Sequence, residues 1–513
     1  MNEPKIILCE LFQPVDILVH GKCLLENPFF VEVKGVFKGP GSKVLVVPGF
    51  FEGDLWVVRF SPVVLGTWTY ELSSAHIHIK EAVGEIICVE NTNPLIHGSV
   101  KVNPHYPHHF CFEDGTPYFM MGYEANWLWA LGLHDPEVNK VRELAFILKS
   151  YGYNLVLMNV YAHDHPVRNK GKTYDKDYGP PDLYAWEGTN EHPDHSRLNI
   201  EFFRNMDRVI RCLMEQGIVV HLYFKVYNKE VHWPKKYSAE DSLYFSYVTA
   251  RYQAFPNIIW DFSKECRKEP DKEYVASRLK MIKALDGYGR LVTVHDDEFF
   301  YSIPGYNCFL DFYTAQQHFD YYTTVLLEKA KHKWPVFNAE YGYEHRTEEN
   351  EECTAGEHSG EEIVHRACQI VMAGGYPGYY YKDTAFDVID YSFHPRGYSC
   401  FRNLYNFFTS IEWWKLEPHP EFFISGRPYR CLAIPGKEYL FYCDPGVTAV
   451  VRVETGERSF HACWVDILKG KRYDAIKLGN EAPLSWLQEE VQSTCRFKSP
   501  SKEYPLILYI ESL

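Results

Sequence analysis

The sequence has 513 residues, which at roughly 150 residues per domain predicts about three domains. Hydrophobic residues make up 46% and charged residues 24%, which indicates a folded globular chain. The net charge of −15 provides no basic field to attract a nucleic acid or an anionic lipid surface. No apolar run approaches the ~20 residues that a membrane helix needs. We therefore expect no nucleic-acid partner and no membrane partner.

Cysteine usage and the first residues favour a cytoplasmic location. The stretch from Met1 to Glu10 has no basic segment followed by an apolar core, so we expect no secretory signal. The 14 cysteines run from Cys9 to Cys495 without a C-x-x-C pair, which is typical of free thiols in a reducing compartment. Aromatic residues make up 16%, which suits either core packing or stacking on sugar rings.

Both ends of the chain are predicted to be β-rich. Residues 1–102 contain short alternating runs such as 30–37 and 55–60, separated by glycine and proline, and predict an N-terminal Ig-like β-sandwich. Residues 419–513 return to this pattern and predict a second β-sandwich. Its expected strands are 432–434, 439–443, 447–453, 462–467 and 506–510.

The region 103–418 alternates apolar runs with amphipathic segments. The expected strands are 118–122, 155–160, 218–222, 258–260, 291–294, 308–312, 335–337 and 376–381. The expected helices are 135–152, with Asp135 as N-cap, then 199–216, 244–252, 273–285, 321–331, 361–374 and 398–414. Eight strand–helix units predict a central (β/α)8 TIM barrel with an insertion at 163–198. A doubly wound sheet is the alternative, but no G-x-G-x-x-G follows the first strand.

Two glutamates stand where strands of such a barrel end. Glu265 follows the fourth strand and Glu340 follows the seventh, and these strands face each other across the barrel mouth. Reactive groups of a barrel lie at this face. Either residue alone is better explained as a surface carboxylate or a structural ion pair at a strand end, but the two together favour function.

Two facing carboxyl groups are what the cleavage of a glycosidic bond requires. One must donate a proton to the leaving oxygen, while the other must be ionised to attack or to activate water. A gap of ~5–5.5 Å between them gives retention of configuration, and ~6.5–9.5 Å gives inversion. The sequence does not provide this distance.

Other polar and aromatic residues follow the predicted strands and could bind a polyhydroxylated ligand. They are Glu124, Asn126, Trp127, Asn159, Tyr161, His163, Asn228, His295, Tyr313, His318 and Tyr380. Trp127 or Trp129 could offer a stacking face. Glu344 is a second candidate nucleophile, although it lies further into its loop.

Several motifs extend this interpretation to a known family. The runs Trp56–Pro62 and Gly66–Tyr70 resemble the N-terminal sandwich of a group of bacterial glycoside hydrolases, and His109–Tyr118 is similar to the start of their apiosidase-like barrel. The resemblance implies the retaining clan, with Glu265 as acid/base and Glu340 as nucleophile. That clan usually has an asparagine before the acid/base, which contacts the sugar 2-hydroxyl. Lys264 stands here instead, and could suit an acidic sugar or form a structural ion pair.

The sequence thus predicts a glycoside hydrolase that acts with retention on an oligosaccharide or glycoside, without cofactor or metal. Two alternatives stay open. The first is an inactive carbohydrate-binding protein. The second is a metal-assisted hydrolase or lyase that uses the histidine clusters at 163–165 and 192–195, although no H-E-x-x-H motif is present. A homo-oligomer is also open.

Overall fold

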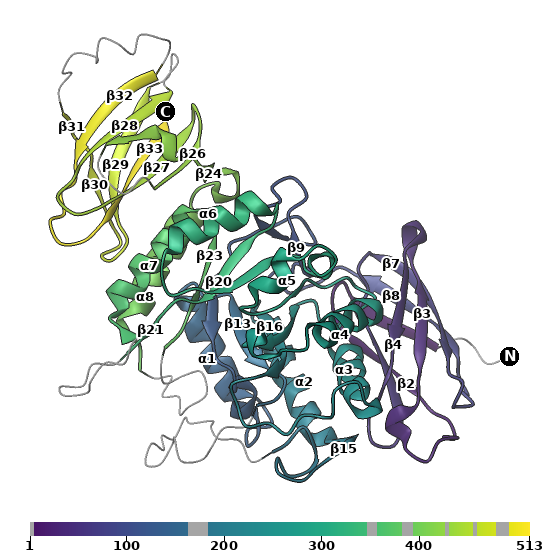
Figure 1. Ribbon diagram of the computed structural model, residues 1–513. Helices are drawn as coiled ribbons and strands as arrows, with labels where there is room; N and C mark the ends of the chain where they lie inside the picture. The colour runs from purple at the N-terminus through teal and green to yellow at the C-terminus, as the bar shows by residue number, and fades with distance from the viewer. Residues whose placement is uncertain are drawn as a thin grey trace.

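The computed structural model describes residues 5–162, 183–345, 357–381, 393–425, 430–454, 459–478 and 492–513. Three parts follow one another along the chain, a strand-rich N-terminal part, a central barrel and a strand-rich C-terminal part (Figure 1). This arrangement confirms the predicted multi-domain fold with a TIM barrel at its centre.

The N-terminal part packs a five-stranded sheet, in the order β1-β8-β7-β3-β4, against a three-stranded sheet, in the order β2-β6-β5. Its strands are β1 (Lys5–Glu10), β2 (Val15–Val19), β3 (Lys34–Lys38), β4 (Val44–Pro48), β5 (Phe50–Phe51), β6 (Trp56–Phe60), β7 (Gly66–Ser73) and β8 (Val83–Val89). Along β7, Trp68, Tyr70 and Leu72 are buried and the residues between them are exposed. This alternation is expected of a strand with one face on the core.

The barrel consists of eight parallel strands in the order β18-β17-β16-β13-β12-β23-β20-β19, and a bridge from His295 to Thr314 joins the two end strands. The strands are β12 (Gly122–Glu124), β13 (Leu155–Asn159), β16 (Val219–Val226), β17 (Ile258–Lys264), β18 (Val292–Thr293), β19 (Tyr313–Gln316), β20 (Val336–Glu340) and β23 (Tyr376–Tyr379). All residues of β13, β16, β17 and β20 are buried, because helices cover the outside and side chains fill the inside.

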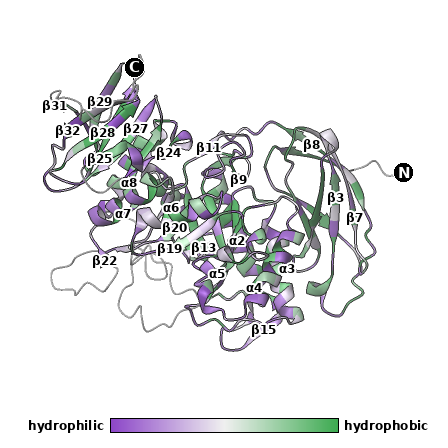
Figure 2. Cartoon of the chain, turned by 45° about the horizontal axis from the view of Figure 1, so that its top comes forward, coloured by the Kyte–Doolittle hydropathy of each residue, from purple (hydrophilic) through white to green (hydrophobic). Residues whose placement is uncertain are grey.

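Each barrel strand is followed by a helix. The helices are α1 (Asn139–Ser150), α2 (Ile200–Glu215), α3 (Ala239–Tyr252), α4 (Lys272–Leu285), α5 (Glu298–Ser302), α6 (Tyr321–Lys331), α7 (Gly360–Met372) and α8 (Arg396–Thr409). The short strands β14 (Trp186–Gly188), β15 (Pro193–Leu198), β21 (Tyr343–Glu344) and β22 (Glu357–His358) lie in the connections. Hydrophilic residues are plentiful on helices α3, α4 and α5 around the more hydrophobic strands (Figure 2). No helix of the described residues is long and apolar enough to cross a membrane.

Two barrel strands lie further along the chain than predicted. The first was expected at 118–122 and the sixth at 308–312, but they are β12 and β19. The apolar residues Phe119, Met120 and Phe312 are buried, but they lie before the strands begin. An apolar run in the sequence indicates buried residues but does not by itself indicate a strand. Here the buried residues form the floor of the barrel.

The start of α1 also differs from the prediction. Asp135 was expected as the N-cap, but Val138 is the cap residue and the helix begins at Asn139. The Asp135 Oδ2 atom instead accepts a 2.9 Å hydrogen bond from the backbone N–H of Lys140. Asp135 therefore still satisfies an N–H of the first turn, although from outside the cap position.

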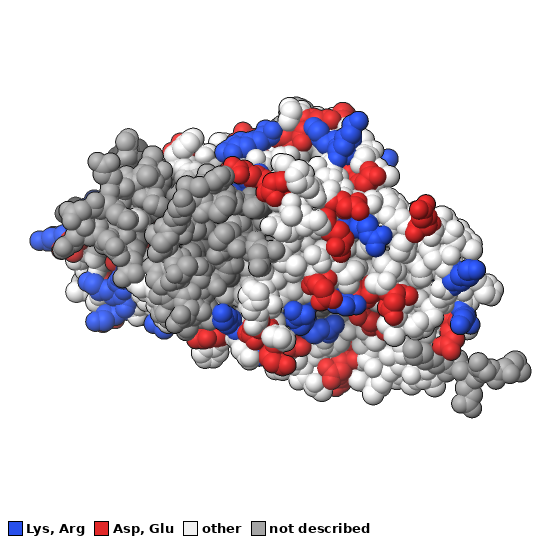
Figure 3. Space-filling view, turned by 90° about the horizontal axis from the view of Figure 1, so that it is seen from below, with Lys and Arg blue, Asp and Glu red and all other residues white. Residues whose placement is uncertain are grey.

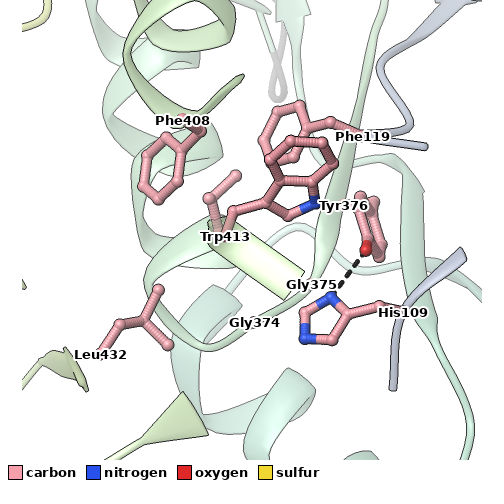
Figure 4. Close-up of a pocket in the computed structure, with 9 residues that line it drawn as sticks. His109, Phe119, Gly374, Gly375, Tyr376, Phe408, Trp413 and Leu432 are labelled. Atoms are coloured by element: carbon pink, nitrogen blue, oxygen red, sulfur yellow. Dashed lines mark hydrogen bonds between the residues drawn. The ribbon is translucent and has the colours of Figure 1, made fainter. Parts of the chain in front are cut away.

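A small sheet and a layer of aromatic rings close the N-terminal end of the barrel. The sheet consists of β9 (Val100–Val102), β10 (Phe110–Phe112) and β11 (Pro117–Tyr118). His109 Nδ1 and Tyr376 OH are 2.7 Å apart there, beside Phe119 and Trp413 (Figure 4). The pocket that these residues line has a volume of only about 10 Å³, hardly room for one water molecule. This pocket is therefore too small to hold a substrate.

The C-terminal part contains a six-stranded sheet, β24-β26-β27-β33-β29-β30, and a four-stranded sheet, β25-β28-β32-β31. Its strands are β24 (Glu417–Pro418), β25 (Phe423–Ser425), β26 (Cys431–Ile434), β27 (Glu438–Cys443), β28 (Thr448–Glu454), β29 (Phe460–Asp466), β30 (Lys471–Asp474), β31 (Lys477–Leu478), β32 (Gln492–Lys498) and β33 (Leu506–Ser512). It contacts α8, where Asn403 Nδ2 donates to Ile467 O at 2.9 Å.

A buried charge cluster joins the N-terminal sandwich to the barrel. Arg59 of β6 and Arg251 of α3 both contact the Asp207 carboxylate of α2, at 2.9 and 2.8 Å. Arg251 also pairs with Glu52 of the sandwich at 2.5 Å, and its side chain is fully buried. Elsewhere, basic and acidic side chains are interspersed on the face seen in Figure 3. No two cysteines of the described ranges form a disulfide.

Candidate active site

Glu340, the last residue of β20, is a buried carboxylate with three polar side chains directed at it. Its Oε2 atom is 2.7 Å from Lys264 Nζ. Its Oε1 atom accepts a 2.7 Å hydrogen bond from Gln316 Nε2 and another from Tyr343 OH. Burial alone would raise the pKa of Glu340, but the Lys264 ammonium and the hydrogen bond from Tyr343 hold this pKa below the usual range. Glu340 is therefore ionised at neutral pH.

Lys264, the last residue of β17, lies between two carboxylates. Besides Glu340, it contacts Glu124 at the end of β12, with 2.5 Å between Nζ and Oε1. Asn126 Nδ2 donates to the same Glu124 oxygen at 2.8 Å. Burial and the neighbouring Glu340 charge raise the pKa of Glu124, although Lys264 opposes the shift. Two carboxyl groups thus share one buried cation.

Glu265 follows directly after β17 in a left-handed backbone conformation, with φ of 60°. Its Oε2 atom is 2.9 Å from Arg267 Nη2 and 3.4 Å from Lys268 Nζ. The Arg267 guanidinium also contacts Asp296, which lies after β18. Burial, together with the charges of Glu265 and Glu340, raises the pKa of Asp296 to about 8. Both glutamates are therefore near the same aspartate, at the C-terminal face of the barrel.

His295 adds a neutral ring beside Glu340. Its Nδ1 atom is 3.2 Å from Tyr223 OH, and its Nε2 atom is 3.9 Å from Glu340 Oε2. Burial, reinforced by the Lys264 charge, holds the pKa of His295 well below its usual value. His295 therefore places an uncharged imidazole against the carboxylate.

Glu124, Asn126, Lys264 and His295, all predicted to bind substrate, belong to this cluster, and two further predicted residues lie close to it. The Tyr380 ring is 5.5 Å from Lys264 Nζ and 4.5 Å from the Tyr343 ring. The His318 ring is 5.6 Å from the Tyr343 ring. Asn228 is half-buried after β16, and its Oδ1 atom has no hydrogen-bond partner among the described residues.

The predicted aromatic stacking residues are packed into the protein. Trp127 and Trp129 are fully buried, and Trp127 Nε1 donates to Ala162 O at 3.1 Å. The Tyr161 ring is 5.6 Å from that of Trp186, and its side chain is buried. These rings offer no exposed face to a sugar in this structure.

Asn159 and Tyr313 also make structural contacts. The Asn159 amide, oriented to satisfy both of its atoms, donates to Asn126 O at 2.7 Å and accepts from Ala162 N at 3.0 Å. Tyr313 is the first residue of β19 and not a residue after the strand, and its ring packs 4.2 Å from that of Tyr301. Gln316, three residues later, takes the place beside Glu340. His163 lies outside the described residues.

Glu344, the second candidate nucleophile, holds the beginning of α8. It accepts a 2.6 Å hydrogen bond from Tyr379 OH, and both its oxygens lie 3.1 Å from the Gly397 N–H. A Cβ atom at Gly397 would come within 2.2 Å of Glu344 Oε2. This close approach indicates a structural carboxylate.

The sequence prediction missed Gln316, Tyr343 and Arg267. Gln316 was missed because the sixth strand was placed too early. Tyr343 is three residues after Glu340 and Arg267 two residues after Glu265, but neither spacing is a recognised signal. The described residues contain no group of three or more His, Cys, Asp or Glu side chains that could hold a metal ion.

The barrel matches the profile of a known family, and the whole chain matches solved structures. The profile "Apiosidase-like, catalytic domain" matches residues 105–389, and a domain of unknown function, DUF5060, matches residues 9–75. No curated protein sequence matches the chain.

The structural matches are similar in fold at low identity. A proposed glycoside hydrolase of Bacteroides vulgatus ATCC 8482 is 18% identical with a TM-score of 0.76, covering 99% of this chain and 100% of that one. A glycoside hydrolase family 5 protein of the same organism is 16% identical with a TM-score of 0.59, covering 81% and 93%. These structural matches show a shared fold. The profile match, which covers more than half of the chain, shows that the chain belongs to the apiosidase-like catalytic domain family.

Proposed function

We propose that the protein is a retaining glycosidase in which Glu340 attacks the anomeric carbon. Glu265 protonates the leaving oxygen and then activates the water that releases the sugar. The observation that carries this proposal is the environment of Glu340, which is ionised, oriented by three donors and placed at the end of the seventh barrel strand.

The contacts of Glu340 suit a nucleophile. A carboxylate has about two acceptor sites on each oxygen. Oε1 accepts from both Gln316 and Tyr343, whereas Oε2 contacts only the Lys264 ammonium at hydrogen-bond distance among the described residues. Oε2 therefore retains a lone pair that can bond to carbon, while the other contacts fix the direction of the carboxylate.

The position of Glu265 suits the acid/base. It directly follows β17, and its carboxyl is buried but contacts two half-exposed cations, Arg267 and Lys268. As acid/base, Glu265 must carry a proton in the first step and must be ionised to activate water in the second.

Lys264 is better explained as part of this machinery than as a receptor for an acidic sugar. Its ammonium already contacts two carboxylates at 2.5 and 2.7 Å, so its charge is neutralised inside the protein. We therefore propose a neutral glycoside as substrate. The 2-hydroxyl contact that the resembling clan assigns to asparagine would then fall to another residue, such as Asn126.

A screen of aryl glycosides, including pentofuranosides, uronides and deoxy sugars, identifies the substrate. With that substrate, Glu340→Gln should abolish hydrolysis while binding persists, and Glu340→Ala with azide should yield a glycosyl azide of inverted configuration. NMR of the first-formed sugar from the wild type should show retention. Glu71→Gln, an exposed position on β7, is the matched control and should keep the wild-type rate.

The same experiment separates the alternatives. Sugar binding without hydrolysis of any glycoside would indicate a binding protein, and activity lost to a chelator would indicate a metal-assisted enzyme. Full activity of Glu340→Gln would refute the proposal outright.

A further inference from the structure

Asp296 and Glu265 are held together by one guanidinium. Arg267 Nη2 is 2.9 Å from Glu265 Oε2, and Arg267 Nη1 contacts Asp296 Oδ2. The two nitrogens belong to the same planar group, so the two carboxyls are neighbours across it. They come from adjacent barrel strands, β17 and β18, just beyond the strand ends.

The backbone at both positions is unusual. Glu265 and Asp296 each have φ of 60°, in the left-handed region that side-chain-bearing residues seldom adopt. Cys266 N donates to His295 O at 3.2 Å, which ties the two strand ends together. Such strain at two adjacent strand ends persists only where the surroundings enforce it, and it is concentrated at functional sites.

Asp296 has one oxygen without a partner. Its side chain is only 3% exposed, and Oδ2 faces Arg267. Oδ1 is buried and has no hydrogen-bond partner among the described residues. A buried ionised oxygen without a donor is costly, whereas a protonated carboxyl removes that charge. The geometry thus favours a proton on this pair of carboxyls.

We propose that Asp296 is a positioning residue that stores the proton used by Glu265. This inference rests on the proposed function. Before the first step the pair of carboxyls holds one proton between them. In the first step that proton goes from Glu265 to the leaving oxygen, while the glycosidic C–O bond breaks, a bond to Glu340 forms and both carboxyls of the pair become ionised. In the second step water attacks the anomeric carbon, the bond to Glu340 breaks, and the proton of that water returns to the pair.

The electrostatics of the site favour this cycle. The titratable groups around Asp296 come from three strands: Arg267, Glu265, Lys264 and Cys266 from β17 and the turn after it, Glu340 from β20, and Tyr313 from β19. The negative charge of Glu340 helps to raise the pKa of Asp296. That charge disappears when Glu340 forms an ester with the sugar, so proton release becomes easier in the step that needs it. It returns when the sugar leaves, which favours uptake of the proton from water.

The test uses Asp296→Asn on the full chain with the aryl glycoside that the wild type hydrolyses. Because an asparagine cannot hold the proton that Asp296 stores, the alkaline limb of kcat/KM should move to lower pH by about one unit or more. For a poor leaving group kcat/KM should fall at least tenfold. For the matching 2,4-dinitrophenyl glycoside, which needs no proton, it should fall less than threefold.

Two further variants make the result decisive. Arg267→Met removes the cation that lowers the pKa of Asp296, so the alkaline limb of this variant should move in the opposite direction, to higher pH. Asp297→Asn alters the next residue, which pairs with Lys272 of α4, and should leave the limb and the leaving-group dependence unchanged. Circular dichroism identifies any variant that fails to fold, and Arg267→Met then still tests the pair.

The two proposals fail differently. If the wild type hydrolyses no glycoside, or if Glu265→Gln is fully active, the proposed function fails. If Glu265→Gln behaves as an acid/base variant but folded Asp296→Asn keeps the wild-type limb and leaving-group dependence, only the role of Asp296 is refuted.

Discussion

Replacing Lys264 with methionine should move the acid limb of activity to higher pH. In the proposed mechanism Glu340 must be ionised to attack. Its pKa is held below the usual range chiefly because the Lys264 ammonium, 2.7 Å away, outweighs burial. An opposite charge at such a distance lowers a carboxyl pKa by about 1–3 units, so its removal should raise the acid limb by about that amount. Each unit corresponds to about 1.4 kcal/mol.

The same substitution should lower stability at neutral pH. A carboxyl with a depressed pKa in the folded state stabilises the fold above its unfolded pKa of about 4.3, and this contribution is lost as pH falls. Replacing Lys264, the buried partner of Glu340 and Glu124, removes this stabilisation of the folded state. Breaking a buried ion pair lowers the free energy of unfolding by about 3–5 kcal/mol. Urea unfolding at pH 7 measures the loss. Lys264→Met/Glu124→Gln should recover part of it, because one unpaired carboxyl is removed.

The assay is kcat/KM from pH 3 to pH 9 on protein shown to be folded. Lys283→Met is the matched control, because Lys283 pairs with Asp311 at 2.9 Å with both side chains partly exposed. Its acid limb should stay at the wild-type position. A folded Lys264→Met variant with an unmoved acid limb would show that Lys264 does not set the charge of Glu340.

Two further substitutions test structural roles inferred here. Glu344→Ala leaves the Gly397 N–H and Tyr379 OH unpaired, so it should lower the free energy of unfolding by about 1–3 kcal/mol. The folded fraction should keep the wild-type kcat/KM. Total loss of activity in a folded variant would contradict this structural role. Arg251→Ala leaves Asp207 with one cation fewer in the buried cluster, so the free energy of unfolding, measured by thermal unfolding, should fall by about 3–5 kcal/mol. A decrease of less than about 1 kcal/mol would show that the cluster does not hold the sandwich to the barrel.

The sequence was sufficient to predict the barrel and the two glutamates after strands four and seven. Hydrophobic periodicity located α2 and α6 to within a residue, because their apolar faces repeat regularly. It misplaced β12 and β19, since the apolar residues before them fill the barrel floor and have the same composition as a buried strand. That error put Tyr313 near the site in place of Gln316.

The contacts of the site could not be predicted. Lys264 stood out as a departure from the resembling clan, but its partner Glu124 is 140 residues away along the chain. Only the closed strand order brings the ends of β12, β17 and β20 together around Lys264. Likewise, nothing in the sequence around Arg267 distinguishes it from an exposed arginine. Its contact with Asp296 depends on the left-handed backbone conformation of Glu265 and Asp296, just after β17 and β18.

The cluster of Arg59, Arg251 and Asp207 also bears on how such chains can diversify. A recombination event that exchanged the sandwich for an unrelated domain would remove Arg59 and Glu52. Arg251 would then keep Asp207 as its acidic partner in this cluster but lose Glu52. A recombined protein of that kind would be less stable than the present chain. We therefore expect sandwich and barrel to be inherited together, with new specificities arising in the loops at the far rim.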